Sequence, residues 1–293
     1  MVVISCSHGK HLGRLIAKKL KTEHSDLFVD KFPDNELRIR LQSKVKNKEV
    51  IFVQSFYGQI NDLIIECILA GSTAKELGAK KVVLLAPYFP YLRQDKRFND
   101  GEAVSQKIIG RLFGNYFDEI IVMDPHLHRT HSLKQVFNTS SKRLTANRMI
   151  AEYIKKKIRN PVIIGPDEES YKWAKHVADM IKVESRILKK KRYSSFHVEV
   201  KLNKKIDLAK RNVVIVDDII STGHTIIETA KILRKLGAKK ITTICVHGIF
   251  VSNGIEKLRK ENIEVISCNT VPNKFDKIDV SKLFSDAISG KKN

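Results

Sequence analysis

The sequence lacks a GxxxxGK[ST] loop, a CxxC pair and any apolar run of membrane-spanning length. Residues 82–92 are largely apolar, but Pro87 and Pro90 interrupt them. These absences exclude a P-loop nucleotide site and predict no transmembrane helix. The first residues have a strand-like pattern without a signal segment, and the four cysteines stand far apart. We therefore expect a cytoplasmic location with reduced thiols.

Acidic residues are few relative to basic ones, since 54 lysines and arginines stand against 32 aspartates and glutamates, for a net charge of +22. Such an excess raises the question of nucleic-acid binding. The cations are spread along the chain, with short clusters at residues 155–157 and 189–192, and no aromatic residues are interleaved with them as stacking platforms. We expect a solvated, lysine-rich surface that favours polyanionic small substrates, with no nucleic-acid or membrane partner.

The chain contains a diffuse internal repeat. Residues 77–81 (LGAKK) recur as residues 236–240, each time between a helical and a strand-like pattern, with glycine at the expected helix C-cap. Upstream, the strand-like residues 50–55 correspond to residues 213–218. LGAKK alone is an ordinary choice for such a junction, but the matching strand and helix before it favour duplication.

Strand-like and helical patterns alternate through both halves, and 293 residues are long enough for two domains. We predict an α/β protein with two similar doubly wound domains related by internal duplication. The polar residues 138–146 (NTSSKRLTA) separate two periodic segments. The predicted domains are therefore residues 1–145 and 146–278.

Residues 213–225 (VVIVDDIISTGHT) combine the features of a sugar-phosphate site. Four β-branched residues predict a strand buried on both faces, with Asp217 and Asp218 at its carboxyl end, where open α/β sheets bind ligands. The STGHT loop precedes an amphipathic helix expected over residues 226–236, so its hydroxyls and N–H groups form an anion site. Gly223 allows the backbone to approach a ligand closely. Together they describe ribose 5-phosphate.

The alternative is an ordinary strand–turn–helix with two acidic turn residues and Ser221 as the helix N-cap. Three further segments in the first half are unusual for a plain α/β domain: FPDNE at 32–36, YLRQDKRF at 91–98 and MDPHLHRTH at 123–131. The first also fits a type I turn with proline at its second position. The other two follow apolar strands, where a solvated loop competes with a ligand site.

The histidine cluster in the third segment has a metal-site alternative. His126, His128 and His131 lack the i, i+4 spacing of helical zinc ligands, and no cysteine is near. Zinc is the less favoured interpretation.

FPDNE, YLRQDKRF, MDPHLH, GPDEES (165–170) and DDIISTGHT follow one another in an order that resembles the ribose-phosphate pyrophosphokinases, and archaeal members in particular. The resemblance covers essentially the whole chain. It departs from the usual family pattern at Ser221 and His224, which remain polar. It implies transfer of the diphosphoryl group of ATP to the anomeric hydroxyl of ribose 5-phosphate.

The resemblance also implies an N-terminal ATP-binding domain, a C-terminal phosphoribosyltransferase-like domain that binds ribose 5-phosphate, and a last helix in residues 279–293 that returns to the first domain. Mg²⁺ is the implied cofactor, placed by His126 and Asp167. The residues implied for ATP are Phe32, Asp34, Asn35, Glu36, Arg93, Gln94 and Asp95. Those implied for ribose 5-phosphate are Arg192, Asp217, Asp218, Ser221, Thr222, Gly223, His224 and Thr225.

Lys190 and Arg192 match the mobile catalytic loop of the family. Residues two apart in an extended segment share a side, so both cations can reach one transferring group. Lys189 and Lys191 leave the register open by one residue, and the alternative is a basic hairpin with solvated charges. In the family, the FPDNE turn completes a neighbouring subunit's ATP site, so the resemblance implies a homo-oligomer, at least a dimer.

Two other function classes compete. A phosphoribosyltransferase shares only the second-half motif and lacks FPDNE and RQDKRF. A regulatory relative that binds nucleotide without catalysis loses motif residues, whereas Lys190, Arg192, Asp217 and Asp218 are all present. The sequence leaves open regulation by phosphate or ADP, the oligomer size beyond a dimer, the nucleotide donor and the preferred metal.

Overall fold

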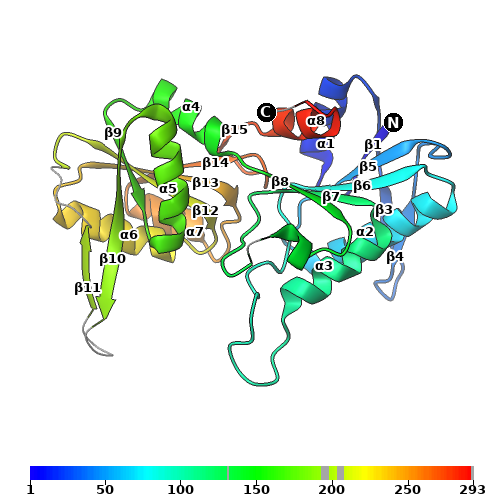
Figure 1. The fold of residues 1–293 in the computed structure, drawn as a ribbon, viewed down its shortest axis with the longest axis horizontal. Helices are drawn as coiled ribbons and strands as arrows, with labels where there is room; N and C mark the ends of the chain where they lie inside the picture. The colour runs from blue at the N-terminus through cyan, green and yellow to red at the C-terminus, as the bar shows by residue number, and fades with distance from the viewer. Residues whose placement is uncertain (131, 193–197, 203–207, 292–293) are drawn as a thin grey trace. The chain divides into compact units, whose positions relative to one another are not determined.

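The computed structural model describes residues 1–130, 132–192, 198–202 and 208–291. The chain divides into two compact units (Figure 1). Unit 1 comprises residues 1–144 and 280–293, and unit 2 comprises residues 145–279. None of the described helices is both long enough and apolar enough to cross a bilayer.

Unit 1 is built on a six-stranded parallel sheet with the strand order β2-β1-β5-β6-β7-β8. Its strands are β1 (Val2–Ser5), β2 (Glu23–Asp26), β5 (Glu49–Val53), β6 (Lys81–Ala86), β7 (Glu119–Met123) and β8 (Ser140–Leu144). A separate antiparallel hairpin joins β3 (Phe28–Lys31) and β4 (Leu37–Arg40). The central strands are apolar throughout because helices cover both faces of a parallel sheet.

Figure 1 shows α1 (Lys10–Leu20) and α8 (Ser281–Ile288) on one face of this sheet, and α2 (Ile60–Glu76) and α3 (Ser105–Tyr116) on the other. The C-terminal helix α8 therefore packs in unit 1, against α1. A phenylalanine cluster fills the α2–α3 side with edge-to-face ring contacts. Its members are Phe52, Phe56, Phe89, Phe113, Phe117 and Phe137.

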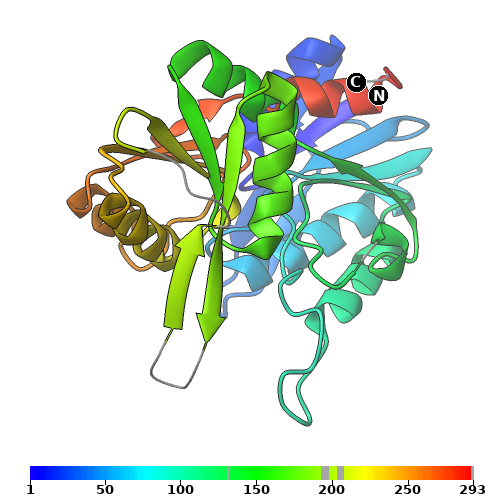
Figure 2. The ribbon, with the colours of Figure 1, turned by 60° about the vertical axis from the view of Figure 1, so that its left-hand side comes forward.

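Unit 2 has a seven-stranded sheet with the order β11-β10-β9-β12-β13-β14-β15. The strands are β9 (Pro161–Gly165), β10 (Glu184–Arg192), β11 (Val198–Leu202), β12 (Asn212–Ile220), β13 (Lys240–Gly248), β14 (Ile263–Cys268) and β15 (Asp276–Ile278). All pairs are parallel except β10 with β11. β10 pairs with β9 only over residues 184–187, and its second half pairs with β11 alone, so the β10–β11 hairpin extends beyond the sheet (Figure 2).

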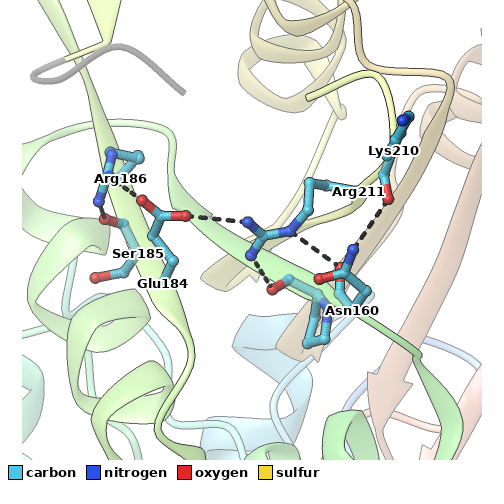
Figure 3. Close-up of polar contacts among 7 residues, drawn as sticks. Asn160, Glu184, Ser185, Arg186, Lys210 and Arg211 are labelled. Carbon is cyan, nitrogen blue, oxygen red and sulfur yellow. Dashed lines mark hydrogen bonds and ion pairs between the residues drawn. The ribbon is translucent and has the colours of Figure 1, made fainter. Parts of the chain in front are cut away.

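The helices of unit 2 are α4 (Asn147–Lys157), α5 (Glu168–Ile181), α6 (His224–Lys235) and α7 (Gly254–Lys260). α6 and α7 pack with the sheet into one apolar core. At the amino ends of β9, β10 and β12, Arg211 donates to Glu184 Oε2 (3.1 Å) and to the Pro161 carbonyl (2.9 Å), and Arg186 contacts Glu184 (Figure 3). This network fixes the edge of the sheet opposite the strands' carboxyl ends.

The two units share one topology. With β11 set aside, the order β10-β9-β12-β13-β14-β15 repeats the order of unit 1. The register repeats as well, because β5 aligns Val50 with Val82 while β12 aligns Val213 with Ile241. Gly78 and Gly237 both take left-handed φ angles, of 82° and 96°, after the corresponding helices. The predicted fold of two similar α/β domains is confirmed.

Two local features differ from what the sequence indicated. Within the polar stretch at residues 138–146, where the domain break was expected, lies β8, an exposed edge strand, which tolerates polar residues. The helix predicted to start at Ile226 starts at His224, and Gly223 is its N-cap instead of Ser221. Gly223 can occupy that position because it accepts the left-handed φ of 77°.

Candidate active site

β12 carries two adjacent carboxylates toward the carboxyl end of the unit 2 sheet. Asp217 and Asp218 lie inside the strand, which continues to Ile220. After a turn through Ser221, Thr222 and Gly223, His224 and Thr225 begin α6. The first N–H groups of a helix have no acceptor within it, and the helix dipole favours an anion there. Two carboxylates, three hydroxyls and a helix N-terminus thus come from one continuous segment.

The first turn of α5 supplies the partner of Asp217. Ser170 Oγ donates a 2.7 Å hydrogen bond to Asp217 Oδ1, and Asp167 Oδ1 accepts the Ser170 N–H at 2.8 Å. Burial raises the pKa of Asp217 well above its ordinary value, and the charges of Asp218 and Asp167 add to the rise, while the Ser170 bond opposes it. The site therefore concentrates negative charge that hydroxyl donors or a cation would relieve.

The hairpin candidates lie on β10. The backbone register pairs Lys190 with Val200 and Arg192 with Val198. The segment expected as a loop is thus strand through Arg192, although it stands beyond the end of β9. Residues 193–197, which follow Arg192, lie outside the described residues.

In unit 1, the segments that follow β6 and β7 are held together. Asp95 Oδ1 accepts a 2.9 Å charged hydrogen bond from Arg129, and its Oδ2 accepts the Arg129 N–H at 3.2 Å. The Asp95 side chain is only 2% exposed, so this carboxylate anchors the loop that carries Arg93 and Gln94. Both of those residues are exposed.

A second link between the two segments lies deeper. Gln106, on the first turn of α3, donates to the Leu92 carbonyl at 3.0 Å and accepts from the Thr130 hydroxyl at 2.7 Å. Further out, the Glu102 carboxylate accepts the N–H groups of Phe98 and Asn99 at 2.9 and 3.1 Å. The Phe98 ring is 61% exposed, with Lys96 Nζ 5.0 Å from its centroid. The loop is ordered by its own hydrogen bonds and displays cations and an aromatic ring.

FPDNE forms the turn of the β3–β4 hairpin, as its proline position indicated. The Asn35 N–H donates to the Phe32 carbonyl at 2.9 Å, which closes the turn over Pro33, and Asn35 takes φ 73°. Asp34 Oδ1 accepts the Glu36 N–H at 3.2 Å. Phe32 is 46% exposed. This tip thus presents an aromatic ring and carboxylates to solvent.

The two predicted metal residues belong to different units. His126 follows β7 in unit 1, and Asp167 precedes α5 in unit 2. Within the described residues, no three side chains of His, Cys, Asp or Glu gather at metal-binding distances. His131, the third histidine of the zinc alternative, lies outside those residues.

Unit 1 has different chemistry at the position that corresponds to the carboxylates of unit 2. Gln54 follows β5 where Asp217 continues β12, and its Oε1 accepts the His8 N–H at 2.8 Å. Glu66 of α2, 2% exposed, accepts the Ser7 N–H at 2.7 Å, and burial raises the pKa of this carboxyl. The rings of His8 and Tyr57 stack 4.2 Å apart. Gln54 Nε2 and His8 Nδ1 are buried here without a hydrogen-bond partner among the described residues.

Sequence reasoning missed Ser170, Arg129 and Gln106 as site-building residues. Ser170 and Arg129 stood inside segments that had been noted, but their partners are 47 and 34 residues away. The adjacency of parallel strands was the available signal, because the carboxyl ends of β6 and β7, and of β9 and β12, are neighbours in their sheets.

Comparison with known proteins places the chain in a family. The model of the N-terminal domain of ribose phosphate pyrophosphokinase matches residues 1–116, and the model of the phosphoribosyl transferase domain matches residues 132–282. A ribose-phosphate pyrophosphokinase of Pyrococcus furiosus is 36% identical over 280 residues, covering 96% of this chain and 97% of that protein. One of Methanopyrus kandleri is 34% identical over 291 residues, 98% of each.

The crystal structure of a phosphoribosylpyrophosphate synthetase from Mycobacterium smegmatis has the same fold. It superposes with a TM-score of 0.86, covering 99% of this chain and 98% of that one, at 22% identity. The matches span both units and nearly the full length of the relatives. The resemblance drawn from the five motifs is confirmed, and the chain belongs to the ribose-phosphate pyrophosphokinase family.

Proposed function

We propose that this chain is a diphosphotransferase that joins the diphosphoryl group of ATP to the anomeric hydroxyl of ribose 5-phosphate, giving 5-phosphoribosyl 1-diphosphate and AMP. One observation carries the proposal: β12 and α6 bring Asp217 and Asp218 next to a glycine turn and a helix N-terminus. Family membership, with relatives of that name matched over nearly their full length, supports it.

Ribose 5-phosphate fits this segment by chemistry. The Asp217 and Asp218 carboxylates accept hydrogen bonds from the sugar hydroxyls, which relieves the charge repulsion between them. The 5-phosphate is held by the N–H groups and hydroxyls of residues 221–225, assisted by the α6 dipole. Ser170 fixes the orientation of the Asp217 carboxylate through its 2.7 Å bond.

ATP is assigned to unit 1 and a neighbouring subunit. Arg93 and Gln94 bind its phosphates from the loop that Asp95 anchors to Arg129. The exposed tip of the β3–β4 hairpin, residues 32–36, contacts the adenosine of a second copy. A homo-oligomer, at least dimeric, follows from this shared site.

Magnesium is the proposed cofactor. The Asp167 carboxylate, close enough to Asp217 for its charge to raise that group's pKa, offers the hard oxygen that Mg²⁺ prefers, whereas the nitrogen of His126 suits it less well. When bound, the ion neutralises charge on the phosphate oxygens. The residues of unit 2 fit such a group by the chemistry of their donors.

The reaction transfers a diphosphoryl group without a protein nucleophile. The anomeric hydroxyl releases its proton to solvent as its oxygen forms a bond to the β-phosphorus, the bond from that phosphorus to the oxygen bridging it to the α-phosphorus breaks, and AMP leaves with the electron pair. Catalysis is then alignment and charge stabilisation. Lys190 and Arg192 of β10 are the proposed cations at the transferring group.

One assay tests the proposal. The protein is mixed with ATP, magnesium and ribose 5-phosphate, and ³¹P NMR follows formation of AMP and a diphosphorylated ribose. Asp217→Asn should raise the KM for ribose 5-phosphate roughly 10-fold or more with little change for ATP, since a charged hydrogen bond contributes about 1.5–3 kcal/mol. Asp179→Asn, an exposed carboxylate on α5, is the matched control and should leave both constants unchanged.

Each alternative predicts a different product. A phosphoribosyltransferase would consume 5-phosphoribosyl 1-diphosphate and a nucleobase and release diphosphate, which the same spectra would show. A regulatory relative would bind ATP without forming AMP. Either pattern from the wild-type protein would overturn the proposed activity.

A further inference from the structure

A short segment of unit 2, residues 249–254, lies against the turn that precedes α6. The N–H groups of Ile249 and Phe250 both donate to the Ile220 carbonyl, at 3.0 and 3.2 Å. Ile220 is the last residue of β12, immediately before Ser221. The segment is therefore attached at the point where the strand becomes the turn.

The backbone of this segment is held in unfavourable conformations. Phe250, Ser252 and Asn253 take left-handed φ angles of 49°, 53° and 58°. Asparagine tolerates this region, but a bulky residue such as phenylalanine rarely adopts it. The packing of Phe250 explains how it persists, because its ring lies against Gly248, where an added Cβ would come within 2.4 Å of it, and edge-on to Phe275. Backbone conformations that need such support are typical of functional sites.

Two glycines permit a very close approach between the segment and the turn. A Cβ at Gly254 would lie 2.7 Å from the Ser221 carbonyl oxygen and 3.2 Å from the Thr222 carbonyl carbon. From the other side, a Cβ at Gly223 would lie 3.1 Å from Leu258 Cγ and 3.3 Å from the Gly254 carbonyl oxygen. The backbones of Gly254 and of residues 221–223 thus pack with no side chain between them.

We infer that residues 249–254 form a rigid rear support for the anion-binding turn, and that Gly254 is a positioning residue for ribose 5-phosphate. The backbone contacts of this segment limit how far the N–H groups at the start of α6 can move when the phosphate binds. A turn fixed in advance binds more tightly because less ordering is needed on binding. The identity of the ligand rests on the proposed function, whereas the mechanical role of Gly254 rests on the contacts themselves.

The test compares two glycine substitutions in the same unit. Gly254→Ala forces a methyl group against the Ser221 carbonyl and should displace the turn. Gly237→Ala, at the far end of α6, meets no atom closer than 3.8 Å but is strained by its φ of 96°, so it should lower the melting temperature without touching the turn. We expect Gly254→Ala to raise the KM and the calorimetric Kd for ribose 5-phosphate roughly 10-fold, with the KM for ATP unchanged. Gly237→Ala should leave all three constants unchanged.

A readout without substrate separates this inference from the proposed activity. Amide hydrogen exchange of residues 221–225 should accelerate in Gly254→Ala and stay at the wild-type rate in Gly237→Ala. If Gly254→Ala does not fold, Phe250→Ala removes the ring that packs against Gly248 and Phe275, so it loosens the support without a clash, and exchange at residues 221–225 should again rise. Ile154→Ala, which truncates a buried apolar side chain on α4 of the same unit, is its control and should leave that exchange at the wild-type rate.

Failure of the inference about residues 249–254 and failure of the proposed reaction give different results. Unchanged exchange at residues 221–225 in a folded Gly254→Ala protein, or in Phe250→Ala, would overturn the inference whatever the enzyme's substrate. Equal rises in the KM for ribose 5-phosphate and for ATP would also overturn it, because a support for this turn acts on one substrate only. If the wild-type protein shows no turnover of ATP and ribose 5-phosphate but exchange at residues 221–225 is faster in Gly254→Ala, the proposed reaction is overturned and the supporting role of residues 249–254 stands.

Discussion

Ser170 and Asp217 share a 2.7 Å hydrogen bond that joins the first turn of α5 to β12. The same Asp217 oxygen, Oδ1, also accepts the N–H of Asp218 at 3.0 Å. Two donors therefore converge on one carboxylate oxygen in a place where burial and neighbouring carboxylates oppose its charge. The bond ties the GPDEES turn to the DDIISTGHT segment, two motifs 47 residues apart at these positions.

Replacing Ser170 with alanine should weaken binding of ribose 5-phosphate. Without the hydroxyl, the Asp217 carboxylate loses its orienting donor and is harder to keep charged. We expect the KM for ribose 5-phosphate to rise roughly 5- to 10-fold, which corresponds to about 1–1.5 kcal/mol for the lost hydrogen bond. The KM for ATP should stay unchanged. Ser285→Ala, which removes another buried serine hydroxyl in unit 1, should leave both constants as they are.

Lys190→Ala should reduce kcat and kcat/KM together. A cation that matters most while AMP departs contributes to the transition state and little to ground-state binding. The loss expected for one such group is about 10²–10³ in turnover, with ATP affinity and melting temperature near the wild-type values. Steady-state kinetics and calorimetry measure the three quantities.

Lys189→Ala and Lys191→Ala are the controls for this prediction. They alternate with Lys190 along β10, so both should lose little activity. A large loss at either control, with Lys190→Ala still active, would shift the catalytic register by one residue. Mild effects at all three positions would remove this basic run from catalysis.

Mixing two inactive variants tests whether the ATP site is shared between subunits. Phe32→Ala removes the exposed ring at the tip of the β3–β4 hairpin, and Lys190→Ala removes a proposed catalytic cation. If the hairpin serves a neighbour, dissociation and reassembly of the mixture should create some intact sites and restore part of the activity. Unmixed controls should stay inactive. A fully active monomer by light scattering would contradict the shared site.

Glu119 should make unit 1 sensitive to acid. Burial works to raise its pKa, but ion pairs with Lys142 (2.8 Å) and Lys81 (2.6 Å) outweigh burial and hold the pKa below its ordinary value. A depressed carboxylate stabilises the fold above its unfolded pKa of about 4.3, and that contribution is lost as pH falls through the folded pKa. Glu119→Gln should therefore lower the free energy of unfolding by about 1–2 kcal/mol at neutral pH. The effect is no larger because both lysines are half exposed and solvent weakens their ion pairs.

Chemical denaturation at several pH values measures the free energy of unfolding of wild type and Glu119→Gln. The difference between these two free energies should shrink as pH falls below about 4. Glu49→Gln, whose carboxylate is 3.6 Å from Lys81, is the control and should show a smaller gap. A gap that stays constant down to acidic pH would show that Glu119 acts through packing alone.

The alternation of strands and helices could be predicted from the sequence because parallel strands buried on both faces are apolar throughout, as in residues 213–216. The repeat was detectable because the LGAKK junctions impose the same left-handed glycine in both units. β8 was missed because an edge strand needs no apolar pattern, and the start of α6 because Gly223, not a polar side chain, is its N-cap.

The site was predictable as a set of segments but not as a set of contacts. Asp217 and Asp218 could be placed toward the carboxyl end of a strand from local pattern alone, although β12 continues past them to Ile220. The bonds from Ser170 to Asp217 and from Arg129 to Asp95 could not, because they join residues brought close only by strand order. Gly254 carried no sequence signal, since its importance lies in a backbone contact across two loops.

The two units repeat one topology and one register, yet Gln54 stands where Asp217 stands, and its amide is engaged by the backbone of His8. A protein that kept the acidic pair in both copies would have two equivalent places for a sugar phosphate and no distinction between acceptor and donor. The absence of the pair from unit 1 breaks that equivalence. Under the proposed function, each chain should therefore take up a single equivalent of ribose 5-phosphate, and unit 1 is free to bind a different ligand on the same scaffold.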